Sequence, residues 1–113
     1  MDCYHIWCDL KESHKDLEFA ESVRVYMTYL VTNGLIEGYR LTRRKLGFGP
    51  QELGEFHIII ETKNMAQLEE AFQGAAARRG EFEQVHSAVY RAVKNARFAL
   101  YRDFPDAVRT EAE

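Results

Sequence analysis

The sequence has few cysteines and prolines and no long hydrophobic run. Its two cysteines, Cys3 and Cys8, are five positions apart in a segment that we predict to be one strand. Their side chains should therefore point to opposite faces and cannot form a disulfide with each other. We expect both to be free thiols in a reducing compartment.

The apolar runs contain only a few residues, whereas a membrane-spanning helix needs roughly 20. The first residues, Met1 to His5, do not resemble a signal peptide, so we predict a cytoplasmic protein.

The sequence also lacks an excess of basic residues. It has 15 Lys and Arg against 18 Asp and Glu, a net charge of −3, which argues against nonspecific binding to nucleic acid or to an anionic membrane. With 113 residues, 46% of them hydrophobic, the chain fits one globular domain. We predict that this domain spans residues 1–105 and that residues 106–113 form a polar, mobile tail.

The first half of the sequence predicts a strand, a helix and two further strands. Residues 3–10 alternate, with Tyr4 and Ile6 on one side and His5 and Trp7 on the other. Apolar residues at helical spacing follow over residues 14–33, with Ser13 as a cap. Residues 36–46 are extended and charged, as in an edge strand, and the β-branched segment 55–61 should be a central strand.

The second half predicts two helices and a last strand. Asn64 and Gln67 match a capping box, so a helix should begin there and end near Gly80, and a second helical pattern covers residues 81–95. Residues 96–104 fit either a strand or a continued helix. We predict a strand because three aromatic residues favour one and because Pro105 can terminate it.

This order predicts an α+β fold, a ferredoxin-like βαββαβ plait whose second helical region is split in two. Right-handed crossovers place the helices on one face of a four-stranded antiparallel sheet and leave the other face bare. Patches containing tryptophan and isoleucine are too apolar to remain in water, so we expect a homodimer that joins two bare faces. The predicted bare face carries His5, Trp7, Asp9, Tyr39, Leu41, Arg43, His57, Ile59, Glu61, Arg97 and Tyr101.

Four segments carry a resemblance to a known superfamily: residues 5–9 (HIWCD), 47–50 (GFGP), 54–57 (GEFH) and 99–105 (ALYRDFP). With them, the chain apart from its tail resembles the dimeric α+β barrel superfamily, which includes antibiotic-biosynthesis-monooxygenase-like and stress-responsive A/B barrel proteins. Within it, the segments are similar to a bacterial family of unknown function. The resemblance implies a dimer and small-molecule or cofactor-free oxygen chemistry.

The bare face contains candidate catalytic pairs. Opposed residues of an antiparallel pair have a constant index sum, and if His5 faces Glu61 this sum places Asp9 opposite His57. A carboxylate beside an imidazole orients it and raises its basicity, as a general base requires. The alternative is that these four residues only satisfy one another at the dimer interface.

Other motifs carry weaker signals. Two histidines and a carboxylate could bind a metal, but no segment has the local ligand spacing of a metal site, and we predict no metal or cofactor. The glycines of segment 47–50 precede a strand rather than a helix, so they predict a hairpin connection and not a phosphate loop. The basic cluster at residues 40–45 lacks the stacking aromatics of RNA-recognition modules. His14 and His86 show no partners, and we interpret both as surface or satisfied residues.

We therefore expect a homodimer that binds a small aromatic or amphipathic molecule at the sheet face. Its catalytic residues would be His5 and His57, oriented by Glu61 and Asp9, and its activity would be cofactor-independent oxygenation or proton transfer. The alternative is a non-catalytic interaction module whose sheet face is only an interface. The predicted ligand contacts are Trp7, Tyr39, Arg43, Ile59, Arg97 and Tyr101.

Overall fold

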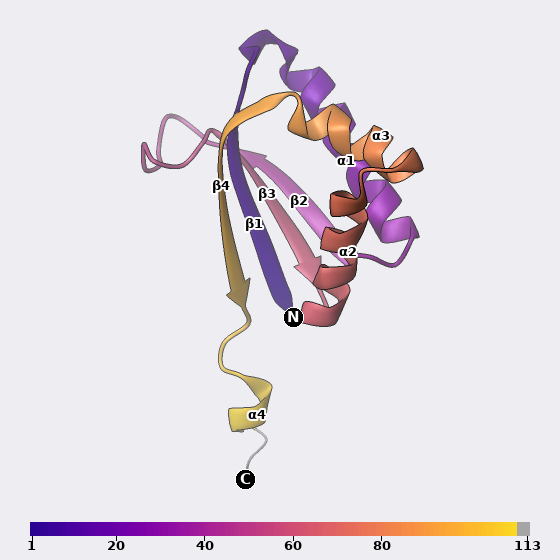
Figure 1. The fold of residues 1–113 in the computed structure, drawn as a ribbon. Helices are drawn as coiled ribbons and strands as arrows, with labels where there is room; N and C mark the ends of the chain where they lie inside the picture. Colours follow the sequence, from indigo (N-terminus) through magenta and orange to yellow (C-terminus); the bar gives the residue numbers. More distant parts are fainter. Residues whose placement is uncertain (111–113) are drawn as a thin grey trace.

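The computed structural model describes residues 1–110 and shows one sheet covered by helices on one side (Figure 1). The α+β class and the predicted element order are confirmed. The elements are β1 (Asp2–Leu10), the 3₁₀ turn η1 (Ser13–Lys15), α1 (Asp16–Thr32), β2 (Gly38–Arg43), β3 (Phe56–Thr62), α2 (Met65–Ala77), α3 (Gly80–Tyr90), β4 (Val93–Arg102) and α4 (Ala107–Thr110).

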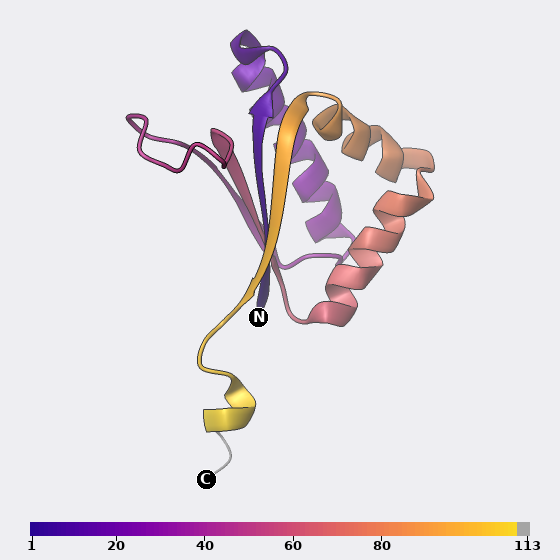
Figure 2. The same cartoon turned by 60° about the vertical axis from the view of Figure 1, so that its left-hand side comes forward.

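The four strands form one open antiparallel sheet in the order β2-β3-β1-β4. Helices α1, α2 and α3 lie on one face, while the long β2–β3 connection extends away from them (Figure 2). This arrangement is the predicted ferredoxin-like plait. No helix or strand within residues 1–110 covers its second face, so we call it the open face.

The core lies between α1 and the two inner strands. Helix α1 buries Phe19, Val23, Met27 and Leu30, which recur every three or four residues and so lie on one side of the helix. Strand β3 alternates between buried and half-buried residues, and its buried set faces the helices. The period of two in β3 and the helical period in α1 therefore produce one continuous apolar layer.

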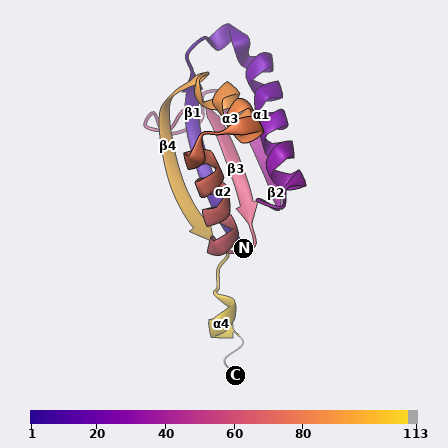
Figure 3. The same cartoon turned by 45° about the vertical axis from the view of Figure 1, so that its right-hand side comes forward.

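Helices α2 and α3 form the rest of the helical layer, in front of the sheet in Figure 3. The Asn64 side chain accepts a hydrogen bond from the backbone N–H of Gln67 at 2.9 Å, which confirms the predicted cap of α2. Where α2 approaches α3, an added Cβ on Gly74 would lie 2.3 Å from the Phe82 ring. Glycine at this position therefore permits the close contact between the two helices.

The last strand begins earlier than predicted, at Val93, and it contains an irregularity. The register between β1 and β4 shifts between Trp7 and Asp9, and Asn95 adopts a positive φ of 57° there. Asparagine tolerates this conformation better than most residues, so a bulge forms at the residue where the predicted helical pattern of residues 81–95 ends. The predicted Ser13 cap is wrong, because Ser13 lies in the 3₁₀ turn and α1 begins at Asp16 without a side-chain cap.

Beyond β4, the chain continues into α4, which stands apart from the sheet in all three views. The predicted tail overlaps α4, and its residues 111–113 lie outside the described part. Among the described helices, none has both the length and the apolar character needed to cross a membrane.

Candidate functional site

The open face holds most of the residues predicted for a site, but in a different register. Cys3 lies opposite Glu61, His5 opposite Ile59 and Trp7 opposite His57. The predicted pairs of His5 with Glu61 and of His57 with Asp9 are therefore wrong by two residues. A shift of two residues keeps every side chain on its face, so the face was predicted correctly while the partners were not.

Instead of pairing with carboxylates, the two histidines contact each other. His5 Nδ1 lies 2.9 Å from His57 Nε2, so one ring donates and the other accepts. The Trp7 ring stacks on His57 with 4.4 Å between centroids, and the edge of Tyr101 meets His5 at 4.9 Å. Burial, followed by the charge of His5, lowers the pKa of His57. These ring contacts form an aromatic cluster on the open face, in which the two histidines and Trp7 are half-buried and Tyr101 is exposed.

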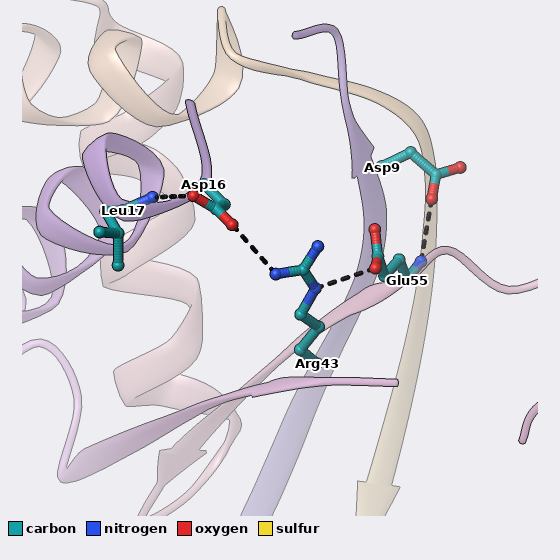
Figure 4. A network of polar contacts seen from close by, with 5 residues as sticks. All are labelled: Asp9, Asp16, Leu17, Arg43 and Glu55. Atoms are coloured by element: carbon teal, nitrogen blue, oxygen red, sulfur yellow. Dashed lines mark hydrogen bonds and ion pairs between the residues drawn. The ribbon is translucent and has the colours of Figure 1, made fainter. Parts of the chain in front are cut away.

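The predicted orienting carboxylate Asp9 has a structural role. One of its oxygens accepts the backbone N–H of Glu55 at 2.9 Å (Figure 4), and the other accepts the Asn95 side chain at 3.2 Å. The Glu55 backbone N–H, followed by the Asn95 amide, lowers the pKa of Asp9. Asp9 therefore ties the end of β1 to the start of β3 and to the bulge of β4.

Two predicted ligand contacts lie on the helix side of the sheet. Tyr39 pairs with the buried Ile60 and Arg43 with the buried Phe56, so both side chains point away from the open face. Arg43 binds Glu55 at 2.9 Å and Asp16 at 3.1 Å (Figure 4). The placement of Tyr39, Leu41 and Arg43 on the open face is therefore wrong.

The remaining predicted contacts do share the open face with Trp7. Ile59 and Glu61 alternate with the buried residues of β3, and Arg97 and Tyr101 lie opposite Trp7 and Cys3. Their functional roles, like those of His5 and His57, stay predictions.

A cavity of about 440 Å³ lies on the other side of the sheet, between the strands and the three helices. Drug-sized ligands are commonly bound in cavities of roughly 300 to 1,000 Å³. Its walls are largely apolar and come from β1, β3, β4, α1, α2 and α3. Phe98 and Leu100 of β4 lie on this side but remain 60% and 49% exposed, because none of the helices described within residues 1–110 covers the sheet edge there.

A small polar cluster stands in this apolar cavity. The cavity is lined by Tyr26 of α1 and by His86 and Tyr90 of α3. The centroid of the His86 ring lies 5.2 Å from that of Tyr26 and 4.9 Å from that of Tyr90. The Tyr90 hydroxyl donates to Glu83 Oε1 at 2.8 Å. In residues 1–110, Glu83 Oε2 and His86 Nδ1 are the only fully buried side-chain polar atoms without a hydrogen-bond partner.

Burial of this cluster affects the protonation states of His86 and Tyr26. Burial lowers the pKa of His86, an effect that the Glu83 carboxylate opposes and Arg78 reinforces. Burial also raises the pKa of Tyr26. His86 is then a neutral base and Tyr26 a hydroxyl donor, so the pair can accept a proton and hydrogen-bond the resulting anion.

The prediction that His86 is a surface or satisfied residue is wrong. Phe82, His86 and Tyr90 recur every four residues, which places three aromatic rings on one side of α3. That spacing was the available signal for a cavity wall. Across residues 1–110, no group of three or more His, Cys, Asp or Glu residues could hold a metal ion.

Comparisons with known proteins identify a family and confirm the fold. The profile of DUF6614, described as a family of unknown function, matches residues 1–113. No curated protein matches the sequence.

Three solved structures are similar in fold over most of this chain. A dimeric protein of unknown function and ferredoxin-like fold from Bacteroides fragilis is 11% identical, with a TM-score of 0.63 over 90% of this chain and 95% of its own. SnoaB, a cofactor-independent oxygenase from Streptomyces nogalater, is 10% identical, with a TM-score of 0.67 over 94% and 95%. An antibiotic biosynthesis monooxygenase is 16% identical, with a TM-score of 0.58 over 93% and 100%. Their similarity over most of this chain confirms the predicted fold.

Proposed function

Because the chain belongs to the DUF6614 family of unknown function, we propose its function from the geometry of the cavity: it binds a planar aromatic molecule with an acidic hydroxyl. The observation that carries the proposal is His86, a half-buried imidazole that lines a cavity whose other walls are largely apolar and aromatic. An apolar cavity with a few converging polar groups is the usual form of a small-molecule site.

The proposed reaction is a proton transfer. The O–H bond of the ligand breaks, its electron pair stays on the oxygen, and the proton moves to His86. The hydroxyl of Tyr26, which keeps its proton, then donates a hydrogen bond to the oxyanion.

A pair of matched probes tests this proposal. 2-Naphthol carries an acidic hydroxyl, whereas 2-methoxynaphthalene has the same rings without that proton. We expect calorimetry to show 2-naphthol binding about tenfold more tightly, since a buried hydrogen bond to a good acceptor contributes about 1 to 1.5 kcal/mol. The preference should disappear in His86→Leu and persist in His14→Leu, which removes an exposed histidine. Equal binding of the two probes to the wild type, or a preference that survives in His86→Leu, would contradict the proposal.

The second part of the proposal is that the protein is a homodimer joined through its open face. The cluster of Trp7, His5, His57 and Tyr101 presents aromatic surface on that face, and Tyr101 is 61% exposed. Two of the similar ferredoxin-like structures, from Bacteroides fragilis and from Jannaschia, are dimeric. An isologous contact would remove both apolar patches from water together.

Charge placed in this interface should separate the protomers. Ile59→Arg introduces an unpaired cation at the centre of the open face, and we expect light scattering to report monomers. Leu17→Arg is the matched control, because Leu17 is 83% exposed on α1 and lies on the helical side. If both variants remain dimeric, the interface lies elsewhere; a monomeric wild type would remove the dimer from the proposal.

A further inference from the structure

The two buried, unpartnered polar atoms belong to residues one helical turn apart on α3, His86 in the cavity wall and Glu83 beside it. Glu83 and His86 are three positions apart on α3, a spacing that brings the Cβ atoms to about 5 to 6 Å from each other. A buried polar atom without a hydrogen-bond partner destabilises the folded state, so each needs an explanation. A carboxylate oxygen can only accept, and an imidazole nitrogen can donate, so each can satisfy the other.

We propose that Glu83 is a positioning residue for His86, with Glu83 Oε2 accepting a hydrogen bond from the Nδ1–H of His86. The two atoms are not hydrogen-bonded to each other in the structure, so a rotation of the side-chain torsions would have to bring them together. The lone pair of His86 Nε2 would then be the one that a ligand in the cavity meets. The inference deepens the proposed function and rests on it, because it assigns the tautomer in which His86 accepts the ligand's proton.

The hydrogen bond from Tyr90 holds Glu83 in place for this role. The Tyr90 hydroxyl donates a hydrogen bond to Glu83 Oε1 at 2.8 Å, so Oε2 is the oxygen that remains to accept one from His86. Glu83 does not line the cavity, whereas Tyr90 and His86 do. Glu83 therefore contacts His86 and not the ligand. Its negative charge stabilises the imidazolium that forms when His86 takes up a proton.

Other charged or titratable groups also surround His86, and they come from several elements. Tyr26 of α1 packs against the ring and Arg78 before α3 acts on its charge, while Tyr4 of β1 and Lys94 of β4 line the same cavity. Arg78 opposes protonation of His86, and Glu83 favours it. Glu83 is the carboxylate among these neighbours, so removing its charge should lower the pKa of His86.

Nuclear magnetic resonance of the ligand-free protein tests the inference through the imidazole nitrogens. In the wild type, the neutral ring of His86 should carry its proton on Nδ1. In Glu83→Gln, which keeps the shape but removes the charge, the titration midpoint of His86 should move to lower pH. In Tyr90→Phe, it should move to higher pH, because Glu83 loses a hydrogen bond that disperses its charge. Glu81→Gln, in the exposed first turn of the same helix, should leave the midpoint unchanged.

Opposite shifts in the two variants would exclude a role in packing alone, because a packing defect does not reverse the sign of a titration shift. A neutral wild-type ring protonated on Nε2, or an unchanged midpoint in Glu83→Gln, would overturn the inference. The probe experiment is separate. If 2-naphthol fails to bind while the tautomer and both shifts are found, the proposed function fails and the Glu83–His86 contact stands.

Discussion

Filling the cavity should stabilise the protein and abolish ligand binding together. Ala75 of α2 lines the cavity and is half-buried, so Ala75→Leu directs a larger apolar side chain into the space of about 440 Å³. The substitution adds three carbon atoms, and at about 0.8 kcal/mol for each buried carbon they contribute up to about 2.4 kcal/mol. The leucine loses about 0.5 to 1 kcal/mol of rotamer entropy on folding, so the free energy of unfolding should rise by about 1.5 kcal/mol in total.

Ala75→Leu should raise the stability of the protein and weaken its binding of the ligand, and a general packing defect would not do both. A gain of about 1.5 kcal/mol should raise the melting temperature by roughly 5 °C in a domain of this size, as measured by circular dichroism. Calorimetry with 2-naphthol should show binding weakened by about tenfold or more, because the new side chain occupies the ligand's volume. Ala76→Leu, its exposed neighbour on α2, should change neither quantity appreciably.

Two outcomes would refute the reasoning. If Ala75→Leu lowers the melting temperature by the amount typical of an overpacked core, the space is not available to a side chain. If the variant is stabilised but binds 2-naphthol as Ala76→Leu does, the cavity exists and the ligand binds elsewhere.

Three further predictions concern the scaffold. Asp9→Asn should destabilise the protein by about 1 kcal/mol at pH 7, because the hydrogen bonds from Glu55 and Asn95 favour the carboxylate. Since the folded-state pKa of Asp9 is depressed, this stabilisation is present above the unfolded pKa of about 3.9 and is lost as the pH falls through the folded value. Urea titrations should therefore show the difference from wild type shrinking below about pH 4, and a constant difference would contradict the assignment. Gly54→Ala should cost about 1 to 3 kcal/mol in the same assay, because a Cβ there would lie 2.4 Å from the backbone of Cys8; an unchanged midpoint would refute that contact. Burial raises the pKa of the Cys8 thiol to about 11, so iodoacetamide should alkylate it only after unfolding, and rapid alkylation of the folded protein would show that it is accessible.

The sequence by itself determined which side chains share a face within each inner strand. The alternation in β1 and β3 depends only on the period of two, which is a local property of extended backbone. The Asn64 cap and the apolar stripe of α1 are likewise local, and both were predicted correctly. Strand β2 followed the same rule: Tyr39 and Leu41 alternate with polar residues, and reading that alternation alone would have placed them with the core.

The tertiary structure decided which residues meet across the sheet and between the layers. A slip of two residues between β1 and β3 preserves both faces, so no alternation pattern can distinguish His5 opposite Glu61 from His5 opposite Ile59. The register follows from contacts between distant segments, such as the hydrogen bond that the backbone N–H of Glu55 donates to the Asp9 carboxylate. The cavity around His86 depends on how α1, α2 and α3 meet the sheet, and these packing distances are absent from the local periodicity of any one element.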